Sequence, residues 1–362
     1  MNMGQDGDKS LNGFSGYGIM ERVMLFGIVF LLVACVSKGT GVVADAVAIE
    51  LDEFGGDSIP LSSISDSVSY ITLETTDSNL IGSIKRIGMT DSLIVLLDEK
   101  TGQVSSYSID GKYYGNIGAV GQGAGEYISP ECIDVDDSLI YVYDSRRGVA
   151  MKYNHGGDFA GCDSVGEGDD FTTITLNGKR CYLLTCYNFP KARAGVFLVD
   201  PAENKRERIM ECKQGIERYH SWDFFKNGDR VSLASNDYEN LIFQWRGDSL
   251  AEIMRLEISP VPSQSDLERW GSKDLLKYYN RMTLFDFDRW LIINYWREKG
   301  GRVVVFDRKL NKWTVGRRFY DDMDTVKGFV SFPFSPGNIL VSAVEGETPD
   351  SNPRLQLRYM KE

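Results

Sequence analysis

The chain has 362 residues, of which 42% are hydrophobic and 12% aromatic, enough for one large or two ordinary globular cores, so a folded chain is expected and not a disordered one. Its 52 acidic and 40 basic residues give a formal net charge of −12, and such a surface repels nucleic acid and anionic lipid headgroups. With only two histidines, the chain cannot supply a three-histidine metal site.

The first 36 residues differ from the rest and predict a signal peptide. The apolar run 23–34 is too short to span a bilayer but suits the core of a signal peptide. It ends in Leu-Val-Ala-Cys at residues 32–35, which resembles the lipobox of bacterial lipoproteins, so Cys35 is the expected lipidation site. The residues before Met20 are polar and rich in glycine, unlike a signal sequence, so the expected start is Met20 or Met24. Residues 37–56 are expected to form a flexible tether.

A repeated unit organises the remainder, residues 57–362. The segment Asp-Ser-Leu-Ile-Val-Leu-Leu-Asp at 91–98 returns as Asp-Ser-Leu-Ile-Tyr-Val-Tyr-Asp at 137–144. Similar β-rich segments begin at four further positions, Arg180, Arg230, Arg289 and Asn338. Successive starts are 43 to 59 residues apart, a spacing typical of propeller blades. Asp-Gly, Gly-Gly and Gly-Asp turns between alternating segments indicate hairpins. We therefore expect an all-β fold of six four-stranded antiparallel blades.

The last unit contains only three candidate strands before the chain ends. The segment 68–73, Val-Ser-Tyr-Ile-Thr-Leu, precedes the first unit and has the character of a strand. Pairing it with the C-terminal strand would complete the sixth blade and leave no open edge in the ring. We expect the propeller to close in this way.

Residues 118–127 form a glycine-rich loop between the first two units, with the sequence Gly-Ala-Val-Gly-Gln-Gly-Ala-Gly-Glu-Tyr. It resembles a loop of the NHL-like or TolB-like six-bladed propeller lipoproteins of Bacteroidetes, although Ala124 stands where that family has proline. The resemblance implies the propeller fold but little about chemistry. Because Glu126 and Tyr127 lead into a strand and not a helix, the loop is interpreted as a structural turn and not a phosphate site.

One segment interrupts the repeat. Residues 263–279 place Leu267, Trp270 and Leu275 at roughly helical spacing, and Ser265 with Glu268 forms a capping box. A short helical insertion over one face of the ring is expected there.

Connectivity predicts which residues share a face of the ring. If the strands of each blade run a to d from the axis outward, the d–a and b–c loops lie on one face, which we predict to bind a ligand. These loops are rich in aromatic and charged residues, which suit a protein or a glycan partner. The candidate ligand-binding residues are Glu126, Tyr127, Arg146, Arg147, Tyr187, Tyr219, His220, Trp222, Tyr295, Trp296 and Arg297. The alternative is that the aromatic residues fill gaps between blades while the charges are solvated.

No catalytic constellation emerges from the sequence, and no residue is assigned as catalytic or as a metal ligand. We therefore expect a binding or scaffold module, tied to the membrane by the lipid anchor only, with no cofactor. The alternative is a calcium-dependent hydrolase or lyase, similar to a lactonase, at the mouth of the channel, with oxygens from Glu126, Asn188, Asn236 and Asn294. Residues 36–40 lack the acidic side chains that mark surface export in lipoproteins of Bacteroidetes, which favours a periplasm-facing anchor in the cell envelope.

Overall fold

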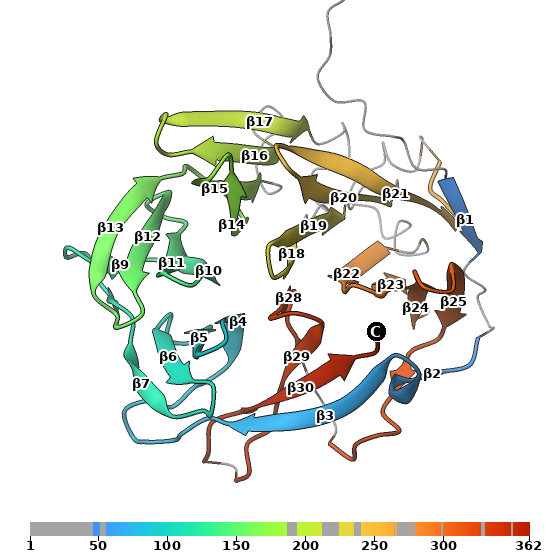
Figure 1. The fold of residues 1–362 in the computed structure, drawn as a ribbon, viewed down its shortest axis with the longest axis horizontal. Helices are drawn as coiled ribbons and strands as arrows, with labels where there is room; N and C mark the ends of the chain where they lie inside the picture. Colours follow the sequence, from blue (N-terminus) through green and yellow to red (C-terminus); the bar gives the residue numbers. More distant parts are fainter. Residues whose placement is uncertain are drawn as a thin grey trace, which may run out of the picture. The chain divides into compact units, whose positions relative to one another are not determined.

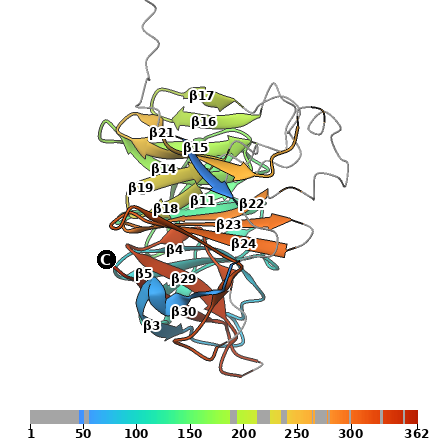
Figure 2. The same cartoon turned by 90° about the vertical axis from the view of Figure 1, so that its right-hand side faces the viewer.

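The computed structural model describes residues 46–50, 56–186, 194–211, 224–234, 240–263, 265, 278, 280–297, 300–326, 330–348 and 350–362. These residues form six antiparallel blades of four strands each around a ring, with one strand of every blade near the centre and one at the rim (Figure 1). Seen from the side, the strands run across the thickness of the ring (Figure 2). The expected six-bladed propeller is confirmed.

Five blades consist of strands that follow one another in the chain. Blades one to three contain β4 (Ile84–Met89), β5 (Leu93–Asp98), β6 (Val104–Ser108) and β7 (Tyr113–Asn116); β10 (Pro130–Val135), β11 (Leu139–Asp144), β12 (Val149–Asn154) and β13 (Phe159–Ser164); and β14 (Asp170–Leu176), β15 (Lys179–Cys186), β16 (Gly195–Asp200) and β17 (Lys205–Glu211). Blades four and five contain β18 (Phe224–Asn227), β19 (Arg230–Ala234), β20 (Leu241–Arg246) and β21 (Ser249–Ser259); and β22 (Asn280–Asp286), β23 (Trp290–Arg297), β24 (Gly300–Asp307) and β25 (Lys312–Gly316).

Blade six joins the two ends of the chain. It contains β27 (Val330–Ser331), β29 (Ile339–Val344), β30 (Arg354–Met360) and β3 (Ser65–Thr72). The pair β3 and β30 is antiparallel, with Ser69 opposite Leu357, and the two strands lie side by side in blue and red in Figure 1. The predicted closing strand at 68–73 is therefore confirmed, because most of it lies in β3.

The loop that enters blade six fastens this closing strand. The Tyr70 hydroxyl donates to Asp324, and the backbone amide of Ser62 donates to Asp322 Oδ1 at 2.9 Å. The fully buried guanidinium of Arg358 on β30 pairs with Asp321 in the same loop. Three carboxylates of one loop thus hold segments that come from opposite ends of the chain.

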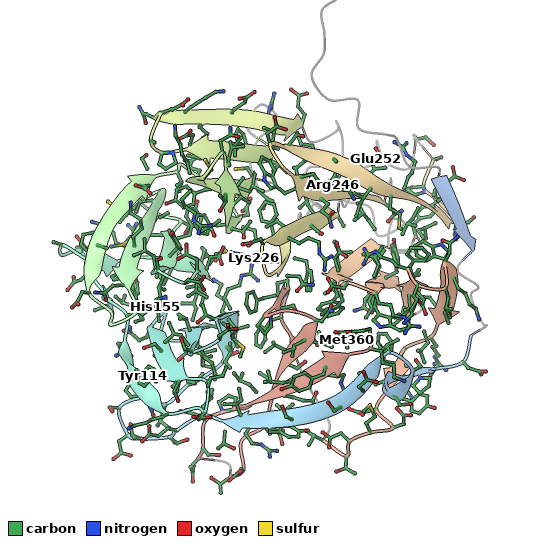
Figure 3. The ribbon with its side chains drawn as sticks, in the orientation of Figure 1. Tyr114, His155, Lys226, Arg246, Glu252 and Met360 are labelled. Carbon is green, nitrogen blue, oxygen red and sulfur yellow. The ribbon has the colours of Figure 1, made fainter. Side chains whose placement is uncertain are left out.

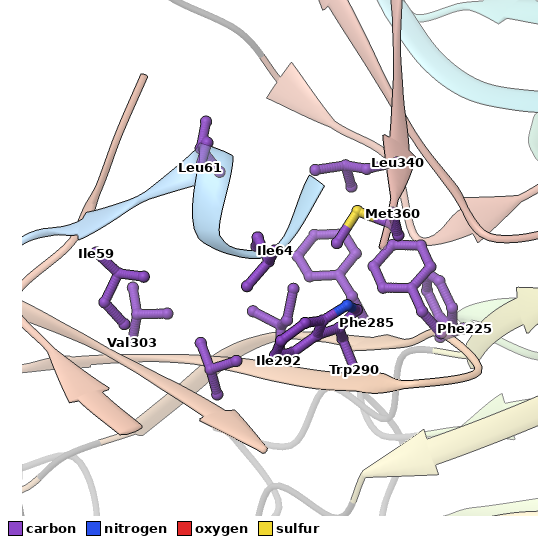
Figure 4. Packing of buried hydrophobic residues seen from close by; sticks show 12 residues of the cluster. Ile59, Leu61, Ile64, Phe225, Phe285, Trp290, Ile292, Val303, Leu340 and Met360 are labelled. Carbon is purple, nitrogen blue, oxygen red and sulfur yellow. The ribbon is translucent and has the colours of Figure 1, made fainter. Parts of the chain in front are cut away.

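Apolar side chains gather between the blades. Six separate clusters of buried residues occupy the six blade–blade interfaces. Strands β5 and β11 are buried along nearly their whole length because a neighbouring blade covers each of their faces, which explains the continuous apolar runs that mark the repeat. Figure 4 shows the cluster between blades five and six, which includes Leu61, Ile64, Trp290 and Met360.

Three short segments near blade five hold the part of the chain that leads into the closing strand β3. β2 (Ile59–Pro60) pairs in parallel with β26 (Phe319–Tyr320), and η1 (Leu61–Ser63), a 3-10 turn, leads from β2 into β3. Leu61 is buried in the cluster of Figure 4. These contacts anchor the chain before the ring begins.

The segment expected to be a flexible tether is partly ordered. Residues 46–50 form β1 (Ala46–Glu50), which pairs in parallel with the outer strand β21 and adds a fifth strand to the rim of blade four (Figure 1). Within the expected tether over 37–56, these five residues have the sequence Ala-Val-Ala-Ile-Glu, and they form a strand because their backbone pairs with the outer edge of β21. The expected helical insertion at 263–279 lies almost entirely outside the described residues.

Removing the closing strand should disrupt the whole ring. A protein that begins at residue 76 lacks β3, which exposes the edge of β30, so we expect aggregation or loss of cooperative unfolding. A protein that begins at residue 56 lacks only β1 and should stay monomeric with a similar melting temperature. Size-exclusion chromatography and thermal unfolding compare the two. An unchanged melting temperature in the shorter protein would contradict the closing role of β3.

Candidate functional site

The predicted binding face is described only in part. Tyr187, Tyr219, His220 and Trp222 lie outside the described residues, as do Asn188 and Asn236. Arg297 ends β23, and its side chain is not described. The prediction can therefore be compared with the structure only at Glu126, Tyr127, Arg146, Arg147, Tyr295 and Trp296.

The glycine-rich loop is held together by its own glutamate. The Glu126 carboxylate accepts a hydrogen bond from the Gly123 amide at 2.7 Å, and a Cβ added to Gly121 would lie 2.1 Å from Glu126 Oε2. Two short strands, β8 (Ala119–Val120) and β9 (Glu126–Tyr127), pair within the loop. This carboxylate fills the place where a phosphate would need free amides, so the geometry agrees with the structural turn.

Tyr127 belongs to the core. Its side chain is fully buried, and its hydroxyl donates to Ile117 O at 2.9 Å while accepting the Val104 amide at 3.0 Å. Burial raises the pKa of this phenol to about 12. The ring therefore has no surface for a ligand, and Tyr127 is removed from the candidate set because it joins blades one and two.

Arg146 and Arg147 remain exposed, on a loop that Asp144 shapes. The buried Asp144 carboxylate accepts the amides of Ile128, Arg146 and Arg147 at 2.8 to 3.2 Å. Arg147 Nη1 donates to the carbonyl oxygen of Glu126 at 2.7 Å. The structure therefore brings the two arginines and Glu126 together at the face between blades one and two.

Tyr295 and Trp296 are neighbours with opposite environments. The Tyr295 side chain is 2% exposed and packs in the cluster between blades four and five, so it fills a gap between blades. Trp296 is 43% exposed. Blade five lies across the ring from the loop of Arg146 (Figure 1), so these candidates do not form one cluster.

The centre of the ring is polar and its charges are paired. Lys226 on β18 lies near the middle of Figure 3, and its Nζ is 2.7 Å from both oxygens of Asp134 on β10. Thr173 adds two hydrogen bonds to Asp134, from its amide at 2.7 Å and its hydroxyl at 2.9 Å. Nearby, Arg86 Nη2 is 3.2 Å from Asp170 Oδ1. Buried charges cost desolvation energy unless they are paired in this way.

Cys132 lies beside this second pair but is not a reactive thiol. Its Sγ donates to Asp170 Oδ1 at 3.2 Å. Burial, assisted by the Asp170 carboxylate, raises the pKa of the Cys132 thiol to about 12. The thiol therefore stays protonated at neutral pH and is a poor nucleophile.

A segment of blade six crosses the channel. After β27 the chain continues as Phe332-Pro333 into β28 (Phe334–Ser335), which pairs in parallel with Lys226 and Asn227 of β18. The Lys226 amide donates to Pro333 O at 3.3 Å. On one side of this segment a cavity of about 40 Å³ lies among Arg86, Asp170 and Phe334, with room for only a few water molecules.

On the other side lies a larger cavity, of about 360 Å³, at the mouth formed by the a–b hairpins. Its walls include four carboxylates, two cationic side chains and apolar groups, which come from blades one, two, three, four and six. The lining comprises Met89, Thr90, Asp91, Val135, Asp136, Asp137, Ser138, Arg180, Lys226, Gly228, Asp229, Phe334, Ser335 and Pro336. It opens on the face opposite to the predicted one.

Sequence reasoning missed this cavity, although one signal for it was present. Asp91 and Asp137 open the two clearest repeats, and each lies in the middle of a three-residue hairpin turn between strands a and b. Equivalent turns of a propeller meet at one mouth of the channel. Recurrence of an acidic residue in that turn therefore indicates a charged mouth.

Metal binding finds no support in the described residues. No three histidine, cysteine, aspartate or glutamate side chains among them are close enough together to hold one ion. Asn294, one of the four suggested calcium ligands, donates to Thr283 Oγ1 at 2.6 Å, and Glu126 bonds its own loop. In the same described part of the chain, no helix is long and apolar enough to cross a membrane.

These features define a closed six-bladed propeller whose channel is blocked by its own side chains. The chain belongs to the family described as a domain of unknown function, DUF4934, whose model matches residues 47–348. No curated protein matches it. The chain is similar to a presumed exported protein of Bacteroides fragilis, with 15% identity and a TM-score of 0.67 over 88% of this chain and 100% of that one. It is also similar to a DUF4221 protein of Bacteroides vulgatus, with 11% identity and a TM-score of 0.53 over 82% and 97% of the two chains.

Such identities establish a shared fold and no shared activity. These two similar structures come from Bacteroides, which supports the resemblance to propeller proteins of Bacteroidetes at the level of the fold.

Breaking the central ion pair should destabilise the ring. Lys226→Met leaves Asp134 charged and buried, so we expect a loss of about 3–5 kcal/mol in the free energy of unfolding. Adding Asp134→Asn removes the uncompensated charge and should restore part of the loss. Lys85→Met breaks the pair of Lys85 with Glu131, which is partly exposed, and should cost less than about 1 kcal/mol. Urea unfolding measures all three, and equal losses for Lys226→Met and Lys85→Met would contradict the structural role of the central pair.

Proposed function

We propose that the chain is a lipid-anchored, extracytoplasmic binding module of the NHL-like type that docks a protein or a glycan and performs no catalysis. The observation that carries this proposal is that the side chains inside the channel contact one another and serve the structure. Lys226 and Asp134 neutralise each other, the Cys132 thiol stays protonated, and β28 blocks the axis. The groups that would do chemistry in an open channel are committed to holding the blades together, which leaves the surface loops for recognition.

Two features support export and anchoring. The Leu-Val-Ala-Cys ending at residues 32–35 matches the requirements of a lipobox, and the similar protein of Bacteroides fragilis is described as exported. Ten residues separate Cys35 from β1, a link that spans at most about 35–40 Å when extended. A lipid on Cys35 would therefore hold the rim of blade four near a periplasm-facing membrane surface.

The docking face of this proposal is formed by the d–a and b–c loops. Trp296 offers a half-exposed aromatic surface, and Arg146 and Arg147 supply exposed cations. Aromatic and arginine side chains dominate the energetics of protein interfaces, and an aromatic plane also suits a sugar ring. The proposed face also includes five further candidates because of their position in the sequence: Tyr187, Tyr219, His220, Trp222 and Arg297.

Lipid attachment can be measured directly. Cells that express the full chain with Cys35→Ala should incorporate no clickable palmitate analogue into it, because no other cysteine follows a lipobox. The control is Cys162→Ala, which changes an exposed cysteine of blade two and should label like the unaltered protein. Unchanged labelling of the Cys35→Ala protein would defeat the anchor.

Docking at Trp296 can be tested by photo-cross-linking in cells. A photoreactive amino acid at position 296 should give a discrete cross-linked product, whereas the same group at Tyr114, which is 58% exposed on β7 at the rim, should not. Trp296→Ala should change the free energy of unfolding by less than about 1 kcal/mol, while Tyr295→Ala should cost about 3–5 kcal/mol. Products of equal intensity at both positions, or none at 296, would contradict docking on this face.

A further inference from the structure

The cavity of about 360 Å³ at the a–b mouth has the size of a small-ligand site, within the range of roughly 300–1,000 Å³. The apolar part of its wall consists of Phe334 and Pro336 of blade six together with Met89 and Val135. Lys226, which also borders the small inner cavity, lies at its inner end. The cavity is thus a pocket closed by the crossing segment and open to solvent.

Turn chemistry fixes which carboxylates face this opening. The Asp136 carboxylate accepts the amides of Ser138 and Leu139 at 2.8 and 2.9 Å, and the Thr90 hydroxyl accepts the Leu93 amide at 3.2 Å. These side chains cap their own hairpins. The residue that follows each one, Asp137 or Asp91, therefore stands exposed at the tip of the turn.

The Asp136 carboxylate already has hydrogen-bond and ion-pair partners. Burial alone would raise its pKa, but the two turn amides, the Tyr141 hydroxyl and Arg180 outweigh burial, so the pKa of Asp136 is lowered. Arg180 Nη2 is 2.5 Å from Asp136 Oδ2. The positive charge of Arg180 is therefore matched by Asp136, just as that of Lys226 is matched by Asp134.

Three carboxylates remain after these pairs are matched. Asp91, Asp137 and Asp229 come from blades one, two and four, and within the described part of the chain none of them has a hydrogen-bond or ion-pair partner through its side chain. They surround a concave site with an apolar wall, a geometry that concentrates the field of like charges on its interior. The pocket thus has excess negative charge and a surface for a hydrocarbon stem.

We propose that this pocket binds an alkylammonium group, whose charge is attracted to the opening lined by Asp91, Asp137 and Asp229 while its methylene stem packs on Phe334 and Pro336. An anion would meet three unpaired carboxylates, and an uncharged apolar ligand would leave them without a partner. The group can come from a lysine of a partner segment or from a free polyamine. The site lies on the face opposite to the proposed docking face, so it stands or falls independently of that function.

Isothermal titration of the folded protein with spermidine and with a capped tri-lysine peptide tests the proposal. The triple variant Asp91→Asn, Asp137→Asn, Asp229→Asn keeps residues that hairpin turns accept and should weaken binding about tenfold, from the sum of three partly exposed pairs. The matched control is Asp110→Asn, Glu203→Gln, Asp248→Asn. It makes the same change in net charge at exposed c–d turns of the same face, outside the pocket, and should bind like the unaltered protein.

The outcomes are distinct. Loss in the pocket variant alone supports the site, and binding of the peptide without spermidine identifies a partner segment as the source, whereas binding of both identifies the free amine as sufficient. Equal weakening by the two triple variants shows attraction by general surface charge and overturns the proposal. If neither spermidine nor the tri-lysine peptide binds, the proposal is overturned as well.

Discussion

Each blade of this protein has two apolar faces, and both are buried only when the ring is complete. A ring with one open joint would expose the facing surfaces of two blades and an unpaired strand edge together. The pairing of β3 with β30 closes that joint, and all six interblade clusters depend on it. The contacts of Tyr70 with Asp324 and of Arg358 with Asp321 hold this joint together. The position of every loop at either mouth follows from this closure.

Closure of the ring also determines which side chains can lie at its centre. The inner strands of six blades approach the axis, and side chains that point inward lose access to bulk water. Lys226, Thr172 and Thr173 bind the oxygens of Asp134 there, and Asp170 is held by Arg86, Cys132 and the Phe224 amide. These contacts join blades one, two, three and four across the axis. These polar contacts therefore hold the blades together at the centre. Contact with partners can then take place only at the two mouths of the channel.

The sequence predicts the blades well because each blade is a local pattern. Alternating and continuous apolar runs, broken by turn residues, identify strands without knowledge of the tertiary fold, and the count of strands predicts the closing segment at 68–73. The crossing segment 332–336 and the fifth strand β1 escape prediction. Both pair with a strand far away in the chain, and two to five residues carry no periodicity.

The candidate site is harder to predict than the fold for a related reason. Whether a loop residue faces a partner depends on its radial position and on local turns, and neither is encoded in strand periodicity. Tyr127 and Tyr295 have the composition of ligand contacts, yet both pack between blades. Conversely, Asp91 and Asp137 resemble ordinary turn residues, and only the ring brings them to one pocket with Asp229.

The two mouths of the ring differ in how far their chemistry can change. The a–b turns in blades one, two and four contain two or three residues between strands, so their aspartates are held at nearly fixed positions by the blades themselves. The d–a and b–c connections are longer, as in the thirteen residues between β7 and β10. Long surface loops tolerate insertion and substitution at small cost in stability, whereas a short turn is tied to its strands. The loop face is therefore the surface that can be remodelled for a particular macromolecular partner, and the turn face is the one preorganised for a small charged group.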